Sequence, residues 1–280
     1  MRPARDLLIQ AADALDRTFP AQGGGPFACG VDLGTASIIL AVLDGAGEPV
    51  ACEMQLCQVA RDGLVVDYMG AIAIVRQLRE KLELRLGAKL TEAAIAVPPG
   101  TGRANAGTHR HIAEAADLEV VQIADEPAAA NKVLQIKNGV VVDIGGGTTG
   151  LSIIEDGSVV YSADEPTGGV HISLVLMGRY KLSFEQAEAF KQDPVNAKEV
   201  RAAALPVLEK MAGIVERHIR GRNVHETWLA GGTSCLPGIE QVFSDVLGIP
   251  AYKPERPMLV TPLGIALCCR AAFECEKVSY

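Results

Sequence analysis

The chain has 280 residues and a formal net charge of −8, with 49% hydrophobic and 21% charged residues. That length fits two domains of roughly 100–150 residues, and the acidic balance excludes the basic surface of a protein that binds nucleic acid or anionic lipid. No apolar run reaches the ~20 residues of a membrane span. Seven unevenly spaced cysteines and no secretory signal predict reduced thiols in the cytoplasm rather than disulfides or a metal site.

Residues 1–26 form the first predicted segment, an amphipathic helix followed by a flexible linker. Five apolar residues recur at helical spacing: Leu8, Ala11, Ala12, Leu15 and Phe19. Pro20 is expected to stop the helix, which would span residues 5–19, and the glycines within residues 21–26 give a tether. Two interpretations stay open: the helix packs back on the body of the protein, or it docks into the groove of a partner.

Residues 27–137 are predicted to form a first α/β lobe, which the C-terminal residues 260–280 rejoin. Its expected elements are strands at 27–33, 37–43 and 48–56, a turn at 61–63, a helix at 72–86, a strand at 92–97, a helix at 104–116 and a strand at 118–123. His109 and His111 fall on the second of these helices. At a spacing of two residues they point apart, so we expect exposed side chains rather than a metal site.

A strand that ends in an aspartate, followed by a glycine–threonine turn and a second strand, occurs twice, at Asp32 and at Asp143. The two turns consist of Gly34, Thr35 and Ala36, and of Gly145, Gly146, Gly147, Thr148 and Thr149. Glycines let successive backbone N–H groups approach an anion, and a carboxylate beside such a turn suits a hard cation that bridges phosphates. The repeat predicts two similar lobes facing each other across a cleft.

Gly145, Gly147 and Gly150 also match the dinucleotide-binding pattern G-x-G-x-x-G, but their context does not. That fingerprint requires a helix directly after the glycines. Here a second apolar run and an Asp156-Gly157 turn predict a β-hairpin instead. The sequence therefore argues against a Rossmann fold.

Residues 138–259 are predicted to form a second lobe around this hairpin. The expected elements are helices at about 170–180 and 183–192, a long helix at 196–220 interrupted at Pro206, a strand at 226–229, a helix from residue 237 and a helix at 262–270 that returns to the first lobe. Glu188 and Lys191 share a helical face, where an exposed ion pair is one interpretation. The glycine pair Gly231 and Gly232 lets a flat ring or a phosphate lie against the backbone.

Glu126 begins a helix that has Pro127 in its first turn and follows a strand directly. This position allows its carboxylate to project into the cleft. A carboxylate at a helix start is also commonly just a partner of the helix dipole. Standing alone, Glu126 is therefore a candidate rather than an assigned catalytic residue.

Five short motifs resemble, in order and spacing, the nucleotide-binding signature of the actin, sugar-kinase and heat-shock chaperone ATPase superfamily. They are VDLGT at 31–35, EPAAA at 126–130, DIGGGTT at 143–149, LAGGT at 229–233 and PLGIA at 262–266. The resemblance covers nearly the whole chain from Phe27, and it implies two ribonuclease-H-like lobes of the actin-like ATPase fold facing across a nucleotide cleft. The RDG turn at 61–63, the YSADEPTGG run at 161–169 and the length are most similar to a chaperone-like branch encoded with a bacterial microcompartment.

The resemblance implies a role for individual residues. Asp32 and Asp143 would organise Mg²⁺ through water, Glu126 would position or deprotonate the attacking water, and the two glycine–threonine turns would hold the phosphates of ATP or ADP. The other implied nucleotide-binding residues are Gly168 and Gly169 at a helix entry, Glu188 and Lys191 at the ribose, and Gly231, Gly232 and Thr233 beside the adenine.

Two departures from the superfamily pattern concern catalysis. Chaperones and filament-forming relatives usually carry an acidic residue where this chain has Gly150, and the first lobe has no lysine placed like the chaperones' catalytic one. Both departures remove charge from the site of the γ-phosphate, where preorganised charge is the main catalytic factor. The resemblance therefore favours nucleotide binding over fast hydrolysis.

The expected function is that of a cytoplasmic, ATP-binding and weakly hydrolysing protein that acts on a partner. The resemblance implies assembly, refolding or protection of a microcompartment enzyme of the ethanolamine ammonia-lyase type, or contact with a shell protein. Because the sequence ends at Tyr280, no separate peptide-binding domain is expected. A small-molecule kinase of the same fold and a scaffold that no longer hydrolyses nucleotide remain as alternatives.

Overall fold

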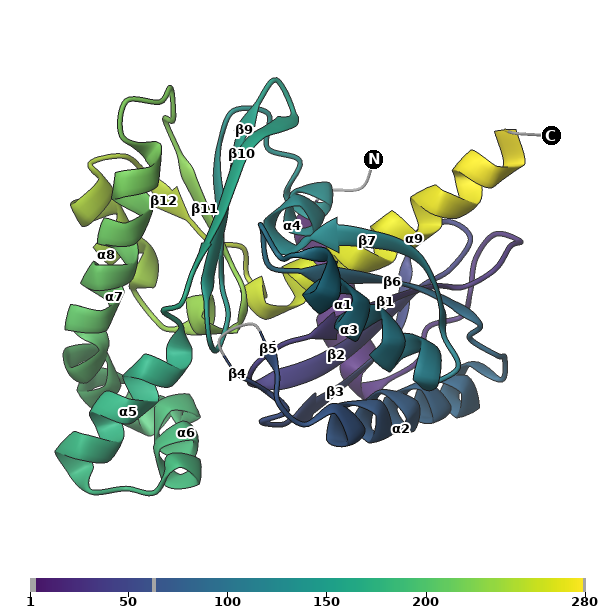
Figure 1. Cartoon of the computed structure of the whole chain (residues 1–280), viewed down its shortest axis with the longest axis horizontal. Helices are drawn as coiled ribbons and strands as arrows, with labels where there is room; N and C mark the ends of the chain where they lie inside the picture. Colours follow the sequence, from purple (N-terminus) through teal and green to yellow (C-terminus); the bar gives the residue numbers. More distant parts are fainter. Residues whose placement is uncertain (1–3, 62–63, 279–280) are drawn as a thin grey trace.

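Two lobes, each built on a five-stranded mixed sheet, make up the protein (Figure 1). The computed structural model describes residues 4–61 and 64–278, so Asp62 and Gly63 of the predicted turn lie outside the described residues. Helices pack on both sheets, as an α/β protein requires. The predicted α/β class with two similar, facing lobes is confirmed.

The first sheet has the strand order β3-β2-β1-β6-β7. Its strands are β1 (Ala28–Leu33), β2 (Ser37–Leu43), β3 (Pro49–Leu56), β6 (Glu92–Val97) and β7 (Glu119–Asp125). The first three strands form an antiparallel meander, whereas β6 and β7 run parallel to β1. A separate two-stranded ribbon is formed by β4 (Ala60–Arg61) and β5 (Leu64–Val65).

The second sheet repeats this arrangement, with the order β10-β9-β8-β11-β12. Its strands are β8 (Gly139–Ile144), β9 (Thr149–Glu155), β10 (Ser158–Glu165), β11 (Thr227–Ala230) and β12 (Ala251–Tyr252). Again three strands form an antiparallel meander, and β11 and β12 continue the sheet in parallel from β8. Asp32 and Asp143 therefore occupy the same place, near the carboxyl end of the central strand of each sheet.

Two helices, α4 (Glu126–Leu134) and α9 (Val260–Val278), lie between the sheets (Figure 1). Their apolar side chains share one core with both sheets, including Ile39 and Val141. The contact is close: a Cβ on Gly264 of α9 would lie 1.9 Å from the carbonyl oxygen of Ala129 on α4. A side chain at that position would push the two helices apart, which gives the PLGIA motif its structural role. The other face of the first sheet is covered by α2 (Tyr68–Leu86) and α3 (Arg103–Ala115).

The N-terminal helix α1 (Ala4–Asp16) packs on β3, which favours the first of the two interpretations of this segment. Its buried residues are Leu7, Leu8, Ala11 and Ala14. Beyond the helix, the amide of Phe19 donates to the carbonyl of Val50. The guanidinium of Arg85 donates to the carbonyl oxygens of Ala14 at 2.6 Å and Arg17 at 2.7 Å. Because the last carbonyls of a helix have no intrahelical partner, Arg85 holds the end of α1 on the first lobe.

The second lobe carries the helices α5 (Gly169–Tyr180), α6 (Phe184–Gln192), α7 (Ala197–Ile219) and α8 (Ile239–Leu247), with short 3₁₀ turns η1 (Pro194–Asn196), η2 (Gly232–Cys235) and η3 (Pro257–Leu259). The predicted interruption at Pro206 is wrong, because α7 runs through this residue. Residues 202 and 206 are both exposed. Water can therefore satisfy the carbonyl that the proline leaves without a donor.

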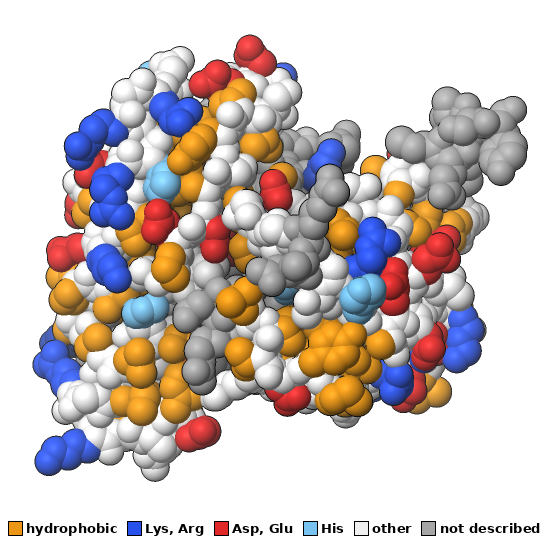
Figure 2. Space-filling view, in the orientation of Figure 1, with side chains coloured by type: hydrophobic (Ala, Val, Ile, Leu, Met, Phe, Trp, Pro, Cys, Tyr) orange, Lys and Arg blue, Asp and Glu red, His pale blue; other side chains and the backbone are white. Residues whose placement is uncertain are grey.

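Two features bear on the prediction that the protein neither spans a membrane nor binds nucleic acid: a long apolar helix and the distribution of its basic side chains. Among the described residues, one window, Pro257–Glu274, is long and apolar enough to cross a membrane, and 67% of it is buried inside the fold. That burial is typical of a core helix, as the packing of α9 shows. On the face shown in Figure 2, Lys and Arg side chains are dispersed among acidic and neutral ones rather than gathered in one basic patch.

Candidate nucleotide-binding site

The two glycine–threonine turns meet between the lobes. A Cβ on Gly146 would lie 3.0 Å from the Cβ of Ala36 and 3.2 Å from its amide nitrogen, so the turns are in direct contact. Beside them lies a cavity of about 100 Å³. Twelve residues expected at the site line it: Asp32, Gly34, Thr35, Ala36, Glu126, Asp143, Gly145, Gly146, Gly147, Thr148, Gly231 and Gly232. We call it the phosphate cavity, because amides of glycine turns and carboxylates surround it.

A second cavity, of about 500 Å³, adjoins the first and shares Ala36, Gly146 and Gly232 with it. Its walls contain four more of the expected residues: Gly169, Glu188, Lys191 and Thr233. Side chains of α7, including Val200, Ala204 and Leu208, make the far wall apolar. A polar entrance with an apolar wall suits a nucleoside, and we call this space the nucleoside cavity.

Two predicted residues lie behind the cavities rather than on their walls. Thr149 is fully buried and its hydroxyl donates to the carbonyl of Thr167 at 2.6 Å. A Cβ on Gly168 would lie 2.5 Å from the carbonyl oxygen of Gly146, so this glycine lets the α5 entry pack against the phosphate turn. Both residues support the turn instead of touching a ligand.

Glu188 and Lys191 form a partly buried ion pair at the nucleoside cavity, not the exposed pair that their spacing alone suggested. The Nζ of Lys191 lies 2.7 Å from Oε1 of Glu188 and 2.8 Å from Oγ of Ser173. The Ser173 hydroxyl donates to the same carboxylate. Since the pair is already fixed by α5, it presents one carboxylate and one ammonium group in a set orientation.

Three carboxyl groups line the phosphate cavity, Asp32, Glu126 and Asp143, and the pKa of each is raised. Burial, reinforced by the charge of Asp143, raises the pKa of Asp32 to about 7. The pKa of Glu126 is raised well above its ordinary value by burial and then by its acidic neighbours, and burial also raises the pKa of Asp143. Unbalanced negative charge in a buried cavity is costly unless a cation or a donor offsets it.

Magnesium fits this donor set, because carboxylate and hydroxyl oxygens are the ligands it prefers and it normally keeps several waters. Asp32 and Asp143 line the cavity from opposite lobes, and Thr148 of the second turn also lines it. Within the described residues, no three acidic, histidine or cysteine side chains converge closely enough to hold an ion directly. The arrangement is therefore compatible with a cation held through water and phosphate oxygens.

Asp164 is a member of the acidic cluster that sequence reasoning missed. It pairs across the β9–β10 ladder with Gly150, the position where the resemblance noted in the sequence leads one to expect an acid. A Cβ on Gly150 would lie 3.4 Å from Oδ1 of Asp164. Burial raises the pKa of Asp164 to about 6, against the opposing effect of a hydrogen bond with Thr148. The neighbouring strand thus places a carboxylate beside the position that lacks one, and only the strand register reveals it.

His109 is the second residue whose place was missed, and the prediction that it is exposed is wrong. It is 3% exposed and lines the phosphate cavity with Asp32 and Glu126. His111, two positions later, points away from the fold and is 66% exposed. The helical period held the signal, because His109 shares the face of the fully buried Ile112 and Ala113.

Two sheets of the same topology, with paired aspartate turns across a nucleoside-sized cleft, define a protein of the actin-like ATPase fold. The comparisons agree. The family model for cell division protein FtsA matches residues 140–264, and the model for MreB/Mbl protein matches residues 50–187. The chain is 43% identical over 267 residues to ethanolamine utilization protein EutJ of Salmonella typhimurium, covering 95% of this chain and 94% of that protein. The chain belongs to the EutJ family of ethanolamine utilization proteins.

Solved structures give the same result. The crystal structure of EutJ from Carboxydothermus hydrogenoformans has a TM-score of 0.87 and 46% identity, covering 94% of this chain and 98% of the other. MreB5 of Spiroplasma citri bound to AMPPNP has a TM-score of 0.73 at 16% identity, covering 92% and 100%, which is a likeness of fold. Chaperone protein DnaK of Thermus thermophilus is 25% identical over 256 residues, which span 69% of this chain and 42% of DnaK.

Proposed function

We propose that this protein binds ATP and ADP with Mg²⁺ in the interlobe cleft and serves ethanolamine utilization as a slowly hydrolysing, chaperone-like switch. One observation carries the proposal: two adjoining cavities, one lined by glycine turns and carboxylates and the other by apolar side chains, are joined at Ala36, Gly146 and Gly232. Phosphates belong in the first and a nucleoside in the second. The AMPPNP and ADP complexes of Spiroplasma citri MreB5, which has the same fold, support this reading of the cleft.

The residues divide the work of binding between the lobes. Amides of the turns at Gly34 and Gly145 would donate hydrogen bonds to the phosphate oxygens, and the fixed Glu188–Lys191 pair would contact the ribose hydroxyls. The missing Cβ of Gly231, which has a positive φ of 85°, avoids a 2.3 Å contact with Oδ1 of Asp143. Gly232 lines both cavities and has open space where a Cβ would stand, so its backbone is accessible to a ring. The adenine would lie against that backbone and the apolar wall of α7.

The chemistry proposed is attack of water on the γ-phosphate, which breaks the bond to the bridging oxygen and releases ADP and inorganic phosphate. Glu126, at the start of α4, would orient that water and hold its proton. Asp32 and Asp143 would hold Mg²⁺ through water, and the ion would supply positive charge that offsets the phosphates. No Lys or Arg is among the described residues that line the phosphate cavity, so charge stabilisation of the transition state is limited and turnover should be slow.

Binding is tested by calorimetry and thermal unfolding with ADP, AMPPNP and Mg²⁺. A ligand that binds only the folded state raises the melting temperature by mass action, and Asp143→Ala should remove the Mg²⁺-dependent part of that increase. Glu80→Gln, on the exposed face of α2, is the matched control. Absence of any shift at millimolar nucleotide would refute nucleotide binding.

The client proposed is an enzyme of the ethanolamine ammonia-lyase type, with a microcompartment shell protein as the second candidate partner. Family membership supports the ethanolamine setting, and the likeness to DnaK supports chaperone-type action. The test is recovery of lyase activity after denaturation, with this protein and ATP, with ADP, and with the Asp143→Ala variant. Recovery that does not depend on ATP or on Asp143 would argue for a passive scaffold.

A further inference from the structure

The phosphate cavity contains one side chain whose chemistry is opposite to that of its neighbours. Three carboxylates face the cavity: Asp32 from β1, Glu126 from α4 and Asp143 from β8. Among the described residues that line it, His109 of α3 is the one that can carry a positive charge. A phosphate entering so acidic a space needs donors besides the turn amides, and imidazole N–H is a donor.

The location of His109 identifies which phosphate it would meet. The two cavities join at Ala36, Gly146 and Gly232, and His109 lines the phosphate cavity without reaching the nucleoside cavity. Glu126 and Pro98 share this distribution. His109 therefore lies in the phosphate part of the cleft and outside the nucleoside cavity, beside the Glu126 that is proposed to orient the attacking water at the terminal phosphate.

The fold directs the side chain of His109 inward, toward the cavity. Strand β6 ends beside Pro98, a short loop follows, and α3 then packs on the sheet with His109 facing inward at 3% exposure. A buried side chain of this type is held in place by its helix, so it needs little reordering when a ligand arrives.

Resting on the proposed function, we infer that His109 donates a hydrogen bond to the γ-phosphate of ATP and so discriminates ATP from ADP. It acts from the first lobe, while the Gly145 turn holds phosphate from the second. His109 thereby takes the place of the chaperones' catalytic lysine, which has no counterpart in this lobe. The γ-phosphate becomes a link between lobes, and the protein has a means of responding to ATP but not to ADP.

The experiment compares Kd values for AMPPNP and ADP, each with Mg²⁺, by calorimetry on the full chain. His109→Leu removes the donor while retaining side-chain volume, His109→Gln retains a donor, and His111→Leu is the control on the same helix. Hydrogen bonds to charged groups are worth enough to change affinity about tenfold or more. We expect His109→Leu to weaken AMPPNP by roughly that factor with ADP nearly unchanged, His109→Gln to recover part of the loss, and His111→Leu to alter neither.

Equal weakening of AMPPNP and ADP in His109→Leu would overturn the inference, because a purely structural role lowers both affinities together. Unchanged AMPPNP binding would overturn it as well. If His109→Leu does not fold, His109→Ala is the second donor-free variant and the same ratio decides. Failure of the wild-type chain to bind either nucleotide would refute the proposed function itself, which distinguishes that result from the others.

Discussion

Thr261 in the first turn of α9 donates a hydrogen bond to the carboxylate of Asp143 at the end of β8. The two residues lie 118 positions apart in sequence and belong to different lobes. Both are buried, at 3% and 7% exposure. The helix that returns to the first lobe therefore orients the aspartate that the second lobe contributes to the cleft.

Replacing Thr261 by valine should destabilise the protein, because Asp143 would lose a buried donor. The expected loss in unfolding free energy is about 1–3 kcal/mol, measured by urea denaturation. We also expect weaker Mg²⁺–nucleotide binding, since Asp143 would be less firmly oriented.

Thr227→Val is the matched control for that variant. Thr227 is also fully buried, but its hydroxyl has no hydrogen-bond partner among the described residues. Its replacement should be neutral or stabilising. A similar loss of unfolding free energy in both variants would show that the Thr261 hydrogen bond does not stabilise the protein.

Leu8→Ala should cost about 2–5 kcal/mol, the usual range for a large-to-small change in a core. Leu8 is fully buried between α1 and the first lobe. Ile9, its neighbour on the helix, is 37% exposed, so Ile9→Ala is the control and should cost much less. Thermal and urea unfolding measure both. Near-equal, small effects would revive the interpretation of residues 5–19 as a docking helix.

Asp32→Asn should raise the melting temperature of the nucleotide-free protein by about 5 °C near pH 8. Burial and Asp143 raise the pKa of Asp32 to about 7, so the native state favours the protonated carboxyl. Stability from this group is fully present below the unfolded pKa near 4 and is lost as pH rises through about 7. The advantage of the variant should therefore shrink as pH falls from 8 to 5. Mg²⁺–nucleotide should raise the melting temperature of the wild-type chain but not that of the variant. An Asp32→Asn protein that is less stable than the wild type at every pH would contradict this account.

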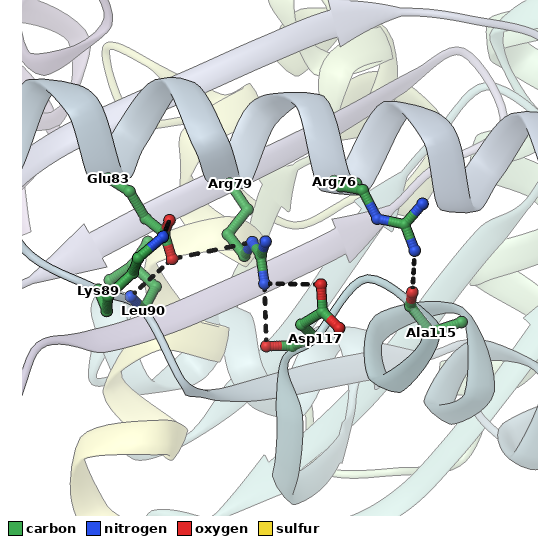
Figure 3. A network of polar contacts seen from close by, with 7 residues as sticks. All are labelled: Arg76, Arg79, Glu83, Lys89, Leu90, Ala115 and Asp117. Atoms are coloured by element: carbon green, nitrogen blue, oxygen red, sulfur yellow. Dashed lines mark hydrogen bonds and ion pairs between the residues drawn. The ribbon is translucent and has the colours of Figure 1, made fainter.

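A polar network on the outer side of the first lobe gives a second pH-dependent prediction (Figure 3). Glu83 of α2 accepts from Lys89 Nζ at 2.6 Å and from the amide of Leu90 at 3.1 Å. Arg79, one turn earlier, donates to the carbonyl of Asp117 at 3.2 Å. The network joins α2 to the loops that precede β6 and β7.

Glu83→Gln should lower stability by about 1–2 kcal/mol at pH 7. Burial alone would raise the pKa of Glu83, but the Lys89 and Leu90 hydrogen bonds and the Arg79 charge outweigh it, so the pKa is lowered. Stability from such a group is present above the unfolded pKa near 4.3 and disappears as pH falls through the lower folded value. Urea denaturation from pH 7 downward should show the two proteins converging in acid. Glu80→Gln, exposed on the same helix, should change little, and a difference that persists in acid would exclude the charge as its cause.

The sequence alone determined the features that depend on neighbouring residues. The hairpins after Asp32 and Asp143 follow from short apolar runs and glycine turns, and the helix start at Glu126 follows from Pro127. The order of these motifs was enough to identify the superfamily. These features rest on backbone preferences within a few residues, which any chain with the same local sequence shares.

The tertiary structure alone decided what those elements meet. It buried His109 in the phosphate cavity, set Asp164 opposite Gly150, packed α1 on β3 and brought Thr261 to Asp143. Helical spacing puts His109 on the same face as Ile112 and Ala113, but it does not show that this face reaches the phosphate cavity. The register of β9 against β10 and the approach of α9 to α4 are fixed by packing between distant segments. Close packing of this kind is a property of the whole fold, so no window of sequence contains it.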